Sequence, residues 1–252
     1  MIILHLSKKT FAQLGATILC LLLVLSCLWA APKIAAVAVT GQKPVYAVER
    51  EEKLLAISFD ASWGAEHTEE ILAILDKYEV KTTFFLVNLW IEAYPDMVKA
   101  IDQRGHEIGL HSTTHPHFTE LSPEQMKEEL NKNKAAVENL TSQSPNIFRP
   151  PYGDYNNTVI ATASEMGLTS VQWSVDSLDW KGLSAQEITE RVLAGAAPGA
   201  IVLLHNNGEH TAEALNRFLP ALQQEGYRIV PVGELLYPNG YTDGNGILHF
   251  GE

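Results

Sequence analysis

The sequence predicts an α/β fold, a distorted (β/α) barrel with about seven parallel strands. Two observations support this prediction. From Lys53 onward, short apolar and β-branched runs alternate with longer segments of helical periodicity, which indicates parallel strands joined by right-handed crossovers. The chain offers about seven such strands, one fewer than a complete eightfold barrel, and this number favours a reduced or distorted barrel.

The expected elements follow one another along the chain. The strands are 54–59, 82–87, 107–110, 147–149, 169–173, 200–204 and 227–230. The helices between them are 69–78, 95–104, 123–140, 158–166, 185–194 and 212–225. Ser122 and Ser184 directly precede two of these helices, and we expect their hydroxyls to cap the free N–H groups of the first turn.

The composition excludes several classes of protein. Hydrophobic residues make up 46% of the 252 residues and charged residues 19%, which is enough apolar material for a sizeable core. The net charge of −12 would repel a phosphate backbone, so nucleic acid is not an expected partner. Both cysteines, Cys20 and Cys27, precede the folded part, which leaves its chemistry to carboxylates, histidines and backbone groups.

The N-terminal residues predict a membrane-spanning or signal segment. No charge occurs from Thr10 to Ala31, and Lys8 and Lys9 precede this apolar run. A run of this length can cross a bilayer with its basic flank in the cytoplasm, so we expect the remainder to be extracytoplasmic, either membrane-anchored or secreted. Cleavage stays open, although the long run favours an anchor. The expected divisions are a signal or anchor segment at 1–31, a linker at 32–52, the main domain at 53–238 and a peripheral tail at 239–252.

Reactive side chains stand at the carboxyl ends of the expected strands. They are Asp60, His111, Arg149, Asp176, Asp179 and His205. The carboxyl ends of parallel strands open onto one face, where such folds place their active sites. Each residue alone is explained as a helix cap, a turn residue or a structural histidine, but the whole set on one face indicates a catalytic cup.

Two motifs add detail to this cup. His111 and His115 are four residues apart, so on one helical turn both imidazoles could reach a single metal ion. Arg149 begins the sequence Arg-Pro-Pro-Tyr-Gly, in which the prolines fix the backbone and Gly153 permits an unusual turn. This turn could aim Arg149 and the Tyr152 amide into the cup.

Two further motifs supply an acid and an aromatic surface. Asp176 and Asp179 are followed by Trp180, whose ring could line a sugar-binding groove. His205 ends an apolar strand, a position that suits a catalytic acid or base better than a packing role.

These motifs occur in the order found in one known family. The matching blocks are 58–60, 111–115, 149–153, 176–180 and 203–205. Between Lys53 and Leu236 the chain therefore resembles the polysaccharide deacetylases of the NodB-homology group, carbohydrate esterase family four. Within that family, the segments Phe-Asp-Ala-Ser-Trp-Gly and Arg-Pro-Pro-Tyr-Gly-Asp-Tyr-Asn are most similar to the sporulation-associated PdaB type.

The resemblance implies a hydrolase that removes N-acetyl groups from amino sugars of a polysaccharide such as peptidoglycan or a chitin-like chain. It implies that Asp60 is the general base, held by Arg149, and that His205 is the general acid, oriented by Asp179. It also implies that His111 and His115 are ligands of a divalent metal, expected to be zinc. The Tyr152 amide would lie in the oxyanion hole. Tyr152 and Trp180 would also contact the substrate. Amide hydrolysis needs such a nucleophile, a stabilised oxyanion and a proton for the leaving amine.

One position departs from the family pattern. Family members carry two consecutive aspartates in the first motif, the second of which binds metal, whereas here Ala61 follows Asp60. Three explanations are open: Asp60 itself coordinates the metal, another side chain such as Glu66, His67 or His117 completes the site, or the protein binds glycan without hydrolysing it. Hydrolysis is favoured because the base and acid positions are filled. The alternatives are a glycan-binding or scaffolding protein and a metal-dependent amidohydrolase for a small N-acyl compound.

Overall fold

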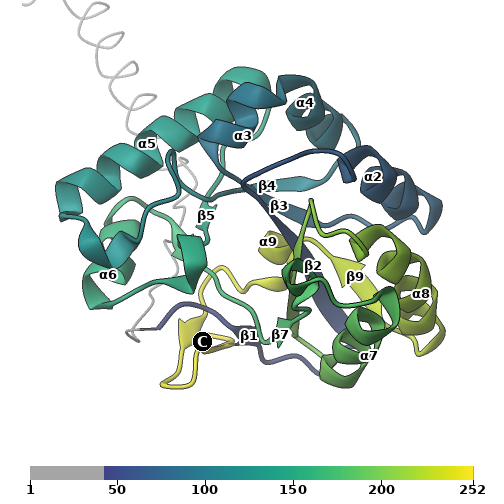
Figure 1. Ribbon diagram of the computed structural model, residues 1–252. Helices are drawn as coiled ribbons and strands as arrows, with labels where there is room; N and C mark the ends of the chain where they lie inside the picture. Colours follow the sequence, from purple (N-terminus) through teal and green to yellow (C-terminus); the bar gives the residue numbers. More distant parts are fainter. Residues whose placement is uncertain (1–42, 252) are drawn as a thin grey trace, which may run out of the picture. The chain divides into compact units, whose positions relative to one another are not determined.

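The computed structural model describes residues 43–251 and confirms the predicted α/β class (Figure 1). Its main sheet has eight parallel strands in the order β6-β5-β4-β3-β2-β8-β7, with β9 beside β2. The strands are β2 (Leu54–Ala61), β3 (Thr83–Leu86), β4 (Glu107–Leu110), β5 (Ile147–Phe148), β6 (Thr169–Ser170), β7 (Val175–Asp176), β8 (Ile201–His205) and β9 (Arg228–Val230). All seven predicted strands are present. The eighth, β7, is only two residues long, too short for a periodic signal.

The distortion of the barrel is centred on β2. Ala56 pairs with both Ile201 of β8 and Val230 of β9, so β9 lies on the same side of β2 as β3. β9 pairs with the first half of β2, and β3 pairs with the second half. The strands β6 and β7 form the two edges of the sheet.

Helices follow the strands and surround the sheet (Figure 1). They are α2 (Thr68–Lys77), α3 (Asn88–Ala93), α4 (Pro95–Gln103), α5 (Pro123–Leu140), α6 (Asn157–Glu165), α7 (Ala185–Gly195), α8 (Thr211–Gln224) and the short α9 (Val232–Leu235). The six predicted helices are confirmed. Ser122 and Ser184 cap α5 and α7 as predicted, each within a capping box that also uses Gln125 or Glu187. None of the helices in the described part of the chain could span a membrane, and residues 10–31 lie outside that part.

Strand β2 is buried along its whole length because it is covered on both faces. Its side chains alternate between two apolar clusters. Leu55, Ile57 and Phe59 join the cluster shared with the helices, whereas Leu54 and Ala56 join a second cluster on the inner face. The same alternation places Ser58 and Asp60 inward, at the carboxyl end of the barrel.

A small second sheet joins the two ends of the described chain. It contains β1 (Ala47–Val48), β10 (Tyr241–Thr242) and β11 (Ile247–His249) in the order β1-β11-β10. Val45, just before β1, is fully buried and bridges Val171, while Ala47 bridges Ala200. The last residues of the expected linker thus pack against the main sheet, and Leu248 of the expected tail joins the same apolar cluster as Val45.

Candidate active site

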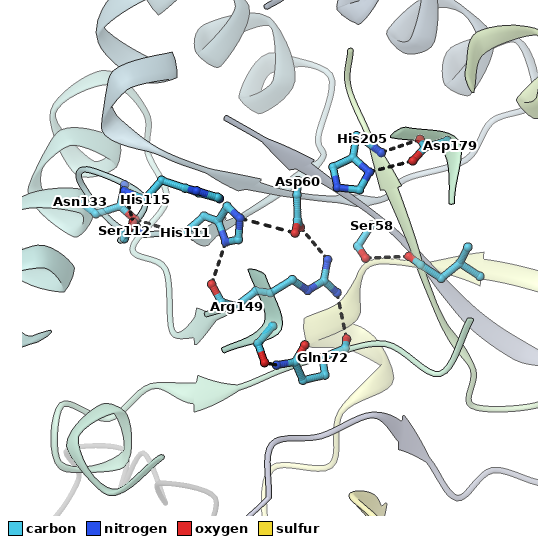
Figure 2. A network of polar contacts seen from close by, with 12 residues as sticks. Ser58, Asp60, His111, Ser112, His115, Asn133, Arg149, Gln172, Asp179 and His205 are labelled. Carbon is cyan, nitrogen blue, oxygen red and sulfur yellow. Dashed lines mark hydrogen bonds and ion pairs between the residues drawn. The ribbon is translucent and has the colours of Figure 1, made fainter. Parts of the chain in front are cut away.

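Asp60 and Arg149 form a buried ion pair at the carboxyl end of β2 (Figure 2). The Arg149 Nη1 donates to Asp60 Oδ1 at 2.8 Å, and its Nη2 donates to the Gln172 carbonyl at 3.0 Å. The guanidinium is fully buried and lies 4.1 Å from the centre of the Phe85 ring. Burial alone would raise the pKa of Asp60, but the charge of Arg149 and its hydrogen bond outweigh burial and hold that pKa below its usual value. Asp60 is therefore a carboxylate at neutral pH.

His111 faces the other oxygen of Asp60. Its Nδ1 donates to the Arg149 carbonyl at 2.7 Å, which leaves Nε2 as an acceptor 3.5 Å from Asp60 Oδ2. Burial lowers the pKa of His111, with Asp60 opposing this only in part, so the ring is neutral. Because Nε2 and Oδ2 are both acceptors, the pair suits a shared proton donor such as the O–H of a water molecule.

His115 lies beside His111, with 5.0 Å between the ring centres. Burial lowers its pKa to about 4, and the neighbouring His111 contributes. Its Nδ1 is buried and has no hydrogen-bond partner within residues 43–251. His115 also has a positive φ of 59°, as does Tyr152. A non-glycine residue in this conformation is strained and is held there by its surroundings.

The chain around His111 is held by two residues of α5. The side-chain oxygen of Asn133 accepts hydrogen bonds from the backbone N–H groups of His111 and Ser112, at 2.9 and 3.0 Å. One turn earlier, Glu129 accepts from the N–H groups of Thr113 and Thr114. The sequence analysis missed Asn133. Its position on the same helix face as Met126, Leu130 and Val137 was the available signal, because a polar residue in a buried stripe needs hydrogen-bond partners.

His205 and Asp179 form the opposite side of the cup (Figure 2). Asp179 Oδ1 accepts from His205 Nδ1, and its Oδ2 accepts from the His205 backbone N–H, both at 2.7 Å. The buried Thr211 hydroxyl donates to the same Oδ2 at 2.7 Å. Burial alone would lower the pKa of His205, but the hydrogen bond and charge of Asp179 outweigh burial, and the pKa is raised. The remaining ring nitrogen, Nε2, can carry a transferable proton.

The Asp60 side and the His205 side of the cup are neighbours across one strand pair. Asp60 and His205 are direct partners in the register of β2 and β8. Asp176 is not part of the same constellation, since its Oδ1 accepts from the N–H of Leu178, which has a positive φ of 55°. Asp176 therefore stabilises the turn that presents Asp179.

Three large aromatic side chains are exposed around these groups. Trp63, Tyr152 and Trp180 are 57%, 57% and 58% exposed. The Tyr152 ring stacks on His117 at 4.3 Å and meets His115 edge-on at 4.4 Å. His117 also lies 3.5 Å from an Asp154 oxygen, so it is placed on the rim of the cup.

The donor set does not complete a three-ligand metal centre. His111 and His115 are neutral imidazoles of the kind that zinc binds. However, no group of three or more His, Cys, Asp or Glu side chains within residues 43–251 is arranged to hold a metal ion. Ala61, at the end of β2, is fully buried and offers no donor atom, and Glu66 is exposed on the following loop. The described residues thus supply two imidazole ligands where a catalytic zinc site has three protein ligands.

Comparisons with known proteins show the family to which the chain belongs. The sequence model of the family described as polysaccharide deacetylase matches residues 47–171. The chain is 38% identical to the peptidoglycan-N-acetylglucosamine deacetylase PgdA of Listeria monocytogenes, over 74% of this chain and 39% of that protein. It is 36% identical to a peptidoglycan-N-acetylglucosamine deacetylase of Bacillus cereus, over 75% of this chain and 91% of that protein.

Other relatives are not known as active deacetylases. The chain is 34% identical to the uncharacterized protein YlxY of Bacillus subtilis, over 77% of this chain and 60% of that protein. The crystal structure of BA3943 from Bacillus anthracis, described as a pseudoenzyme of carbohydrate esterase family four, is 32% identical with a TM-score of 0.75. That match covers 83% of this chain and 73% of the other chain. A mutant of BA3943 is described as having restored enzymatic activity. The chain thus spans 60% of YlxY and 39% of PgdA, both less than two thirds, but 91% of the Bacillus cereus enzyme.

Proposed function

The chain belongs to the polysaccharide deacetylase family, and we propose that it is a hydrolase that removes N-acetyl groups from amino sugars of a cell-wall or spore polysaccharide of the peptidoglycan type. The observation that carries this proposal is the pairing of Asp60 with His205. The two residues are partners on neighbouring strands, and their pKa values are shifted in opposite directions. Such a pair provides a base and an acid at the same pH.

In the proposed reaction, Asp60 Oδ2 takes a proton from a water molecule whose oxygen attacks the acetyl carbonyl carbon. The Tyr152 backbone N–H donates to the oxyanion that develops. His205 then donates its Nε2 proton to the sugar nitrogen as the C–N bond breaks, and acetate and a free amine leave. Arg149 favours the ionised form of Asp60, and Asp179 favours the protonated form of His205.

Zinc is the metal that we propose for His111 and His115, because both donors are neutral nitrogens. Family members typically use a divalent ion, which in such sites polarises the carbonyl and activates water. With two ligands, the affinity of the site for zinc should be low. The proton transfers that we propose use Asp60 and His205.

A glycan-binding protein without hydrolytic activity is the second candidate. Two observations favour it: Ala61 supplies no ligand, and BA3943, a relative of similar fold, is described as a pseudoenzyme. The intact pairs of Asp60 with Arg149 and His205 with Asp179 favour hydrolysis instead.

The location and the subgroup are also proposals. The uncharged run 10–31 supports an extracytoplasmic protein that is membrane-anchored or secreted. The similarity of the Phe59 to Gly64 segment to the PdaB type supports a role in sporulation. Spore wall polymer and vegetative peptidoglycan are both suitable substrates for testing.

The test measures acetate release from N-acetylglucosamine oligomers and sedimentation with insoluble peptidoglycan, using the full-length protein with and without added zinc. Release together with sedimentation is the expected result. Sedimentation without release would support the glycan-binding candidate, and release from small N-acyl compounds alone would support an amidohydrolase. The full-length protein is used because Val45 and Val48 are buried in the core, so that residues 43–48 are part of the fold.

A further inference from the structure

We propose that Trp63 forms an additional sugar-binding surface on the rim of the cup, which takes the pyranose ring next to the sugar being deacetylated. This inference rests on the proposed function, because the ligand is a longer stretch of the same N-acetylated polymer. It concerns binding alone, and so can be tested separately from hydrolysis.

The position of Trp63 next to the cup is the first observation. Trp63 lies in the loop between β2 and α2, and its ring centre is 4.9 Å from that of His115, with the planes at 69°. Tyr152 contacts the same imidazole at 4.4 Å. Trp63, His115 and Tyr152 therefore form one aromatic wall.

This wall stands to one side of the reacting centre. Figure 2 shows His115 and His205 on opposite sides of Asp60. Trp63 contacts His115, the histidine that lies on the side of Asp60 opposite His205. If one sugar of the polymer lies between Asp60 and His205, the next sugar along the polymer would contact the Trp63 ring.

The loop that carries Trp63 is held in place by buried donors. The carbonyl of Gly64, the next residue, accepts from Trp90 Nε1 at 2.6 Å and from Asn206 Nδ2 at 2.8 Å. Asn206 Nδ2 also donates to the buried Thr68 hydroxyl at 3.1 Å. Because the backbone beside Trp63 is already fixed, ligand binding would order little more than one side chain.

The chemistry of an exposed indole suits a sugar ring. Trp63 is 57% exposed although its loop is anchored, so the ring is presented to solvent and is not packed into the core. The C–H groups on one face of a pyranose pack against such an aromatic face, and the uncharged ring suits an N-acetylated sugar. Aromatic anchors of this kind carry a large share of binding energy.

The experiment compares two substitutions of Trp63 in the full-length protein. Trp63→Leu removes the aromatic face but keeps an apolar side chain, whereas Trp63→Phe keeps a smaller aromatic face. Tyr241→Ala is the matched control, because Tyr241 is an exposed aromatic residue on β10, in the second sheet. Calorimetric titration gives the Kd for tetra-N-acetylchitotetraose and for the N-acetylglucosamine monomer.

The tetramer should bind about tenfold more weakly to Trp63→Leu than to the wild type, with a smaller loss for Trp63→Phe and none for Tyr241→Ala. The monomer should show no difference between the variants. Equal tetramer affinity in Trp63→Leu and the wild type, or no tetramer binding by the wild type, would overturn the proposal. If Trp63→Leu weakens tetramer binding while the wild type releases no acetate, the sugar surface stands and hydrolysis does not.

Discussion

His205 and His115 lie on opposite sides of the cup and differ in how fully their ring nitrogens are hydrogen-bonded. His205 is joined to Asp179 through both its ring Nδ1 and its backbone N–H, and Asp179 is held in turn by Thr211. His115 has a buried Nδ1 without a hydrogen-bond partner in the described chain, and its pKa is lowered where that of His205 is raised. The difference teaches that the two sides of the cup are built differently. The His205 ring is held by a network of buried hydrogen bonds, whereas His115 keeps a buried nitrogen to which the described residues supply no partner.

The largest effect is expected from Asp60→Asn, which removes the base and the partner of a buried cation. Turnover should fall by about a hundredfold or more. The free energy of unfolding should also fall, by about 3 to 5 kcal/mol, because Arg149 is left buried without its counter-charge. Chemical denaturation and acetate release measure the two losses. Asp176→Asn is the matched control, and an Asp60→Asn protein with normal turnover would remove Asp60 from the mechanism.

His205→Ala should lose about as much turnover but far less stability. The His205 side chain is partly exposed, and Asp179 keeps two donors, the backbone N–H of residue 205 and the Thr211 hydroxyl. Comparing the denaturation curves of Asp60→Asn and His205→Ala would show whether only the loss of Asp60 lowers the free energy of unfolding. A His205→Ala protein that deacetylates at the wild-type rate would exclude His205 as the acid.

Ala61→Asp should add a third ligand to the metal site that we propose at His111 and His115. Ala61 pairs with Leu86 on β3, and the Leu86 carbonyl accepts from the His111 N–H, so residue 61 and His111 lie at the same level of the sheet, separated by one strand. A carboxylate buried at this position without a partner should lower the Tm, and zinc should restore it. The measurement is the zinc-induced change in Tm, which should be larger for Ala61→Asp than for the wild type. Equal changes would mean that the new carboxylate does not reach the imidazoles.

The smallest effect is expected from Asp179→Asn on the pH dependence of kcat/KM. The Asp179 carboxylate favours the charged form of His205, so neutralising it lowers the pKa of His205. The acid form is then lost at a lower pH, and the basic limb of the profile should move to lower pH. Asp176→Asn serves as the comparison and should move the limb less. A basic limb that stays in place would limit Asp179 to a structural role.

Sequence periodicity predicted most of the helices and strands of the main sheet and its cover. β2 is buried on both faces and is apolar except for Ser58 and Asp60, and α5 begins after a capping box at Ser122. β7 and α3 were missed because two residues and a single short helix carry little periodic signal. The positions of Asp60, Arg149 and His205 at the carboxyl ends of expected strands predicted that these residues would lie close together, and the structure places them so.

The details of the site depended on contacts between distant segments. The hydrogen bonds that Asn133 accepts and that Thr211 donates join residues far apart in the chain. The buried stripe of α5 marks Asn133 as a residue that needs partners, but no local pattern identifies those partners. Whether Glu66 or His117 lies near His111 and His115 is likewise a matter of loop geometry. The stacking of His117 on Tyr152 could not be read from the sequence.

The most direct test of this account is acetate release from tetra-N-acetylchitotetraose by the full-length wild-type protein, compared with an Asp60→Asn, His205→Ala double variant, both with added zinc. The account predicts release by the wild type that depends on enzyme concentration, and none above background by the double variant. No release by a wild-type protein that binds the tetramer, or equal release by both proteins, would contradict it.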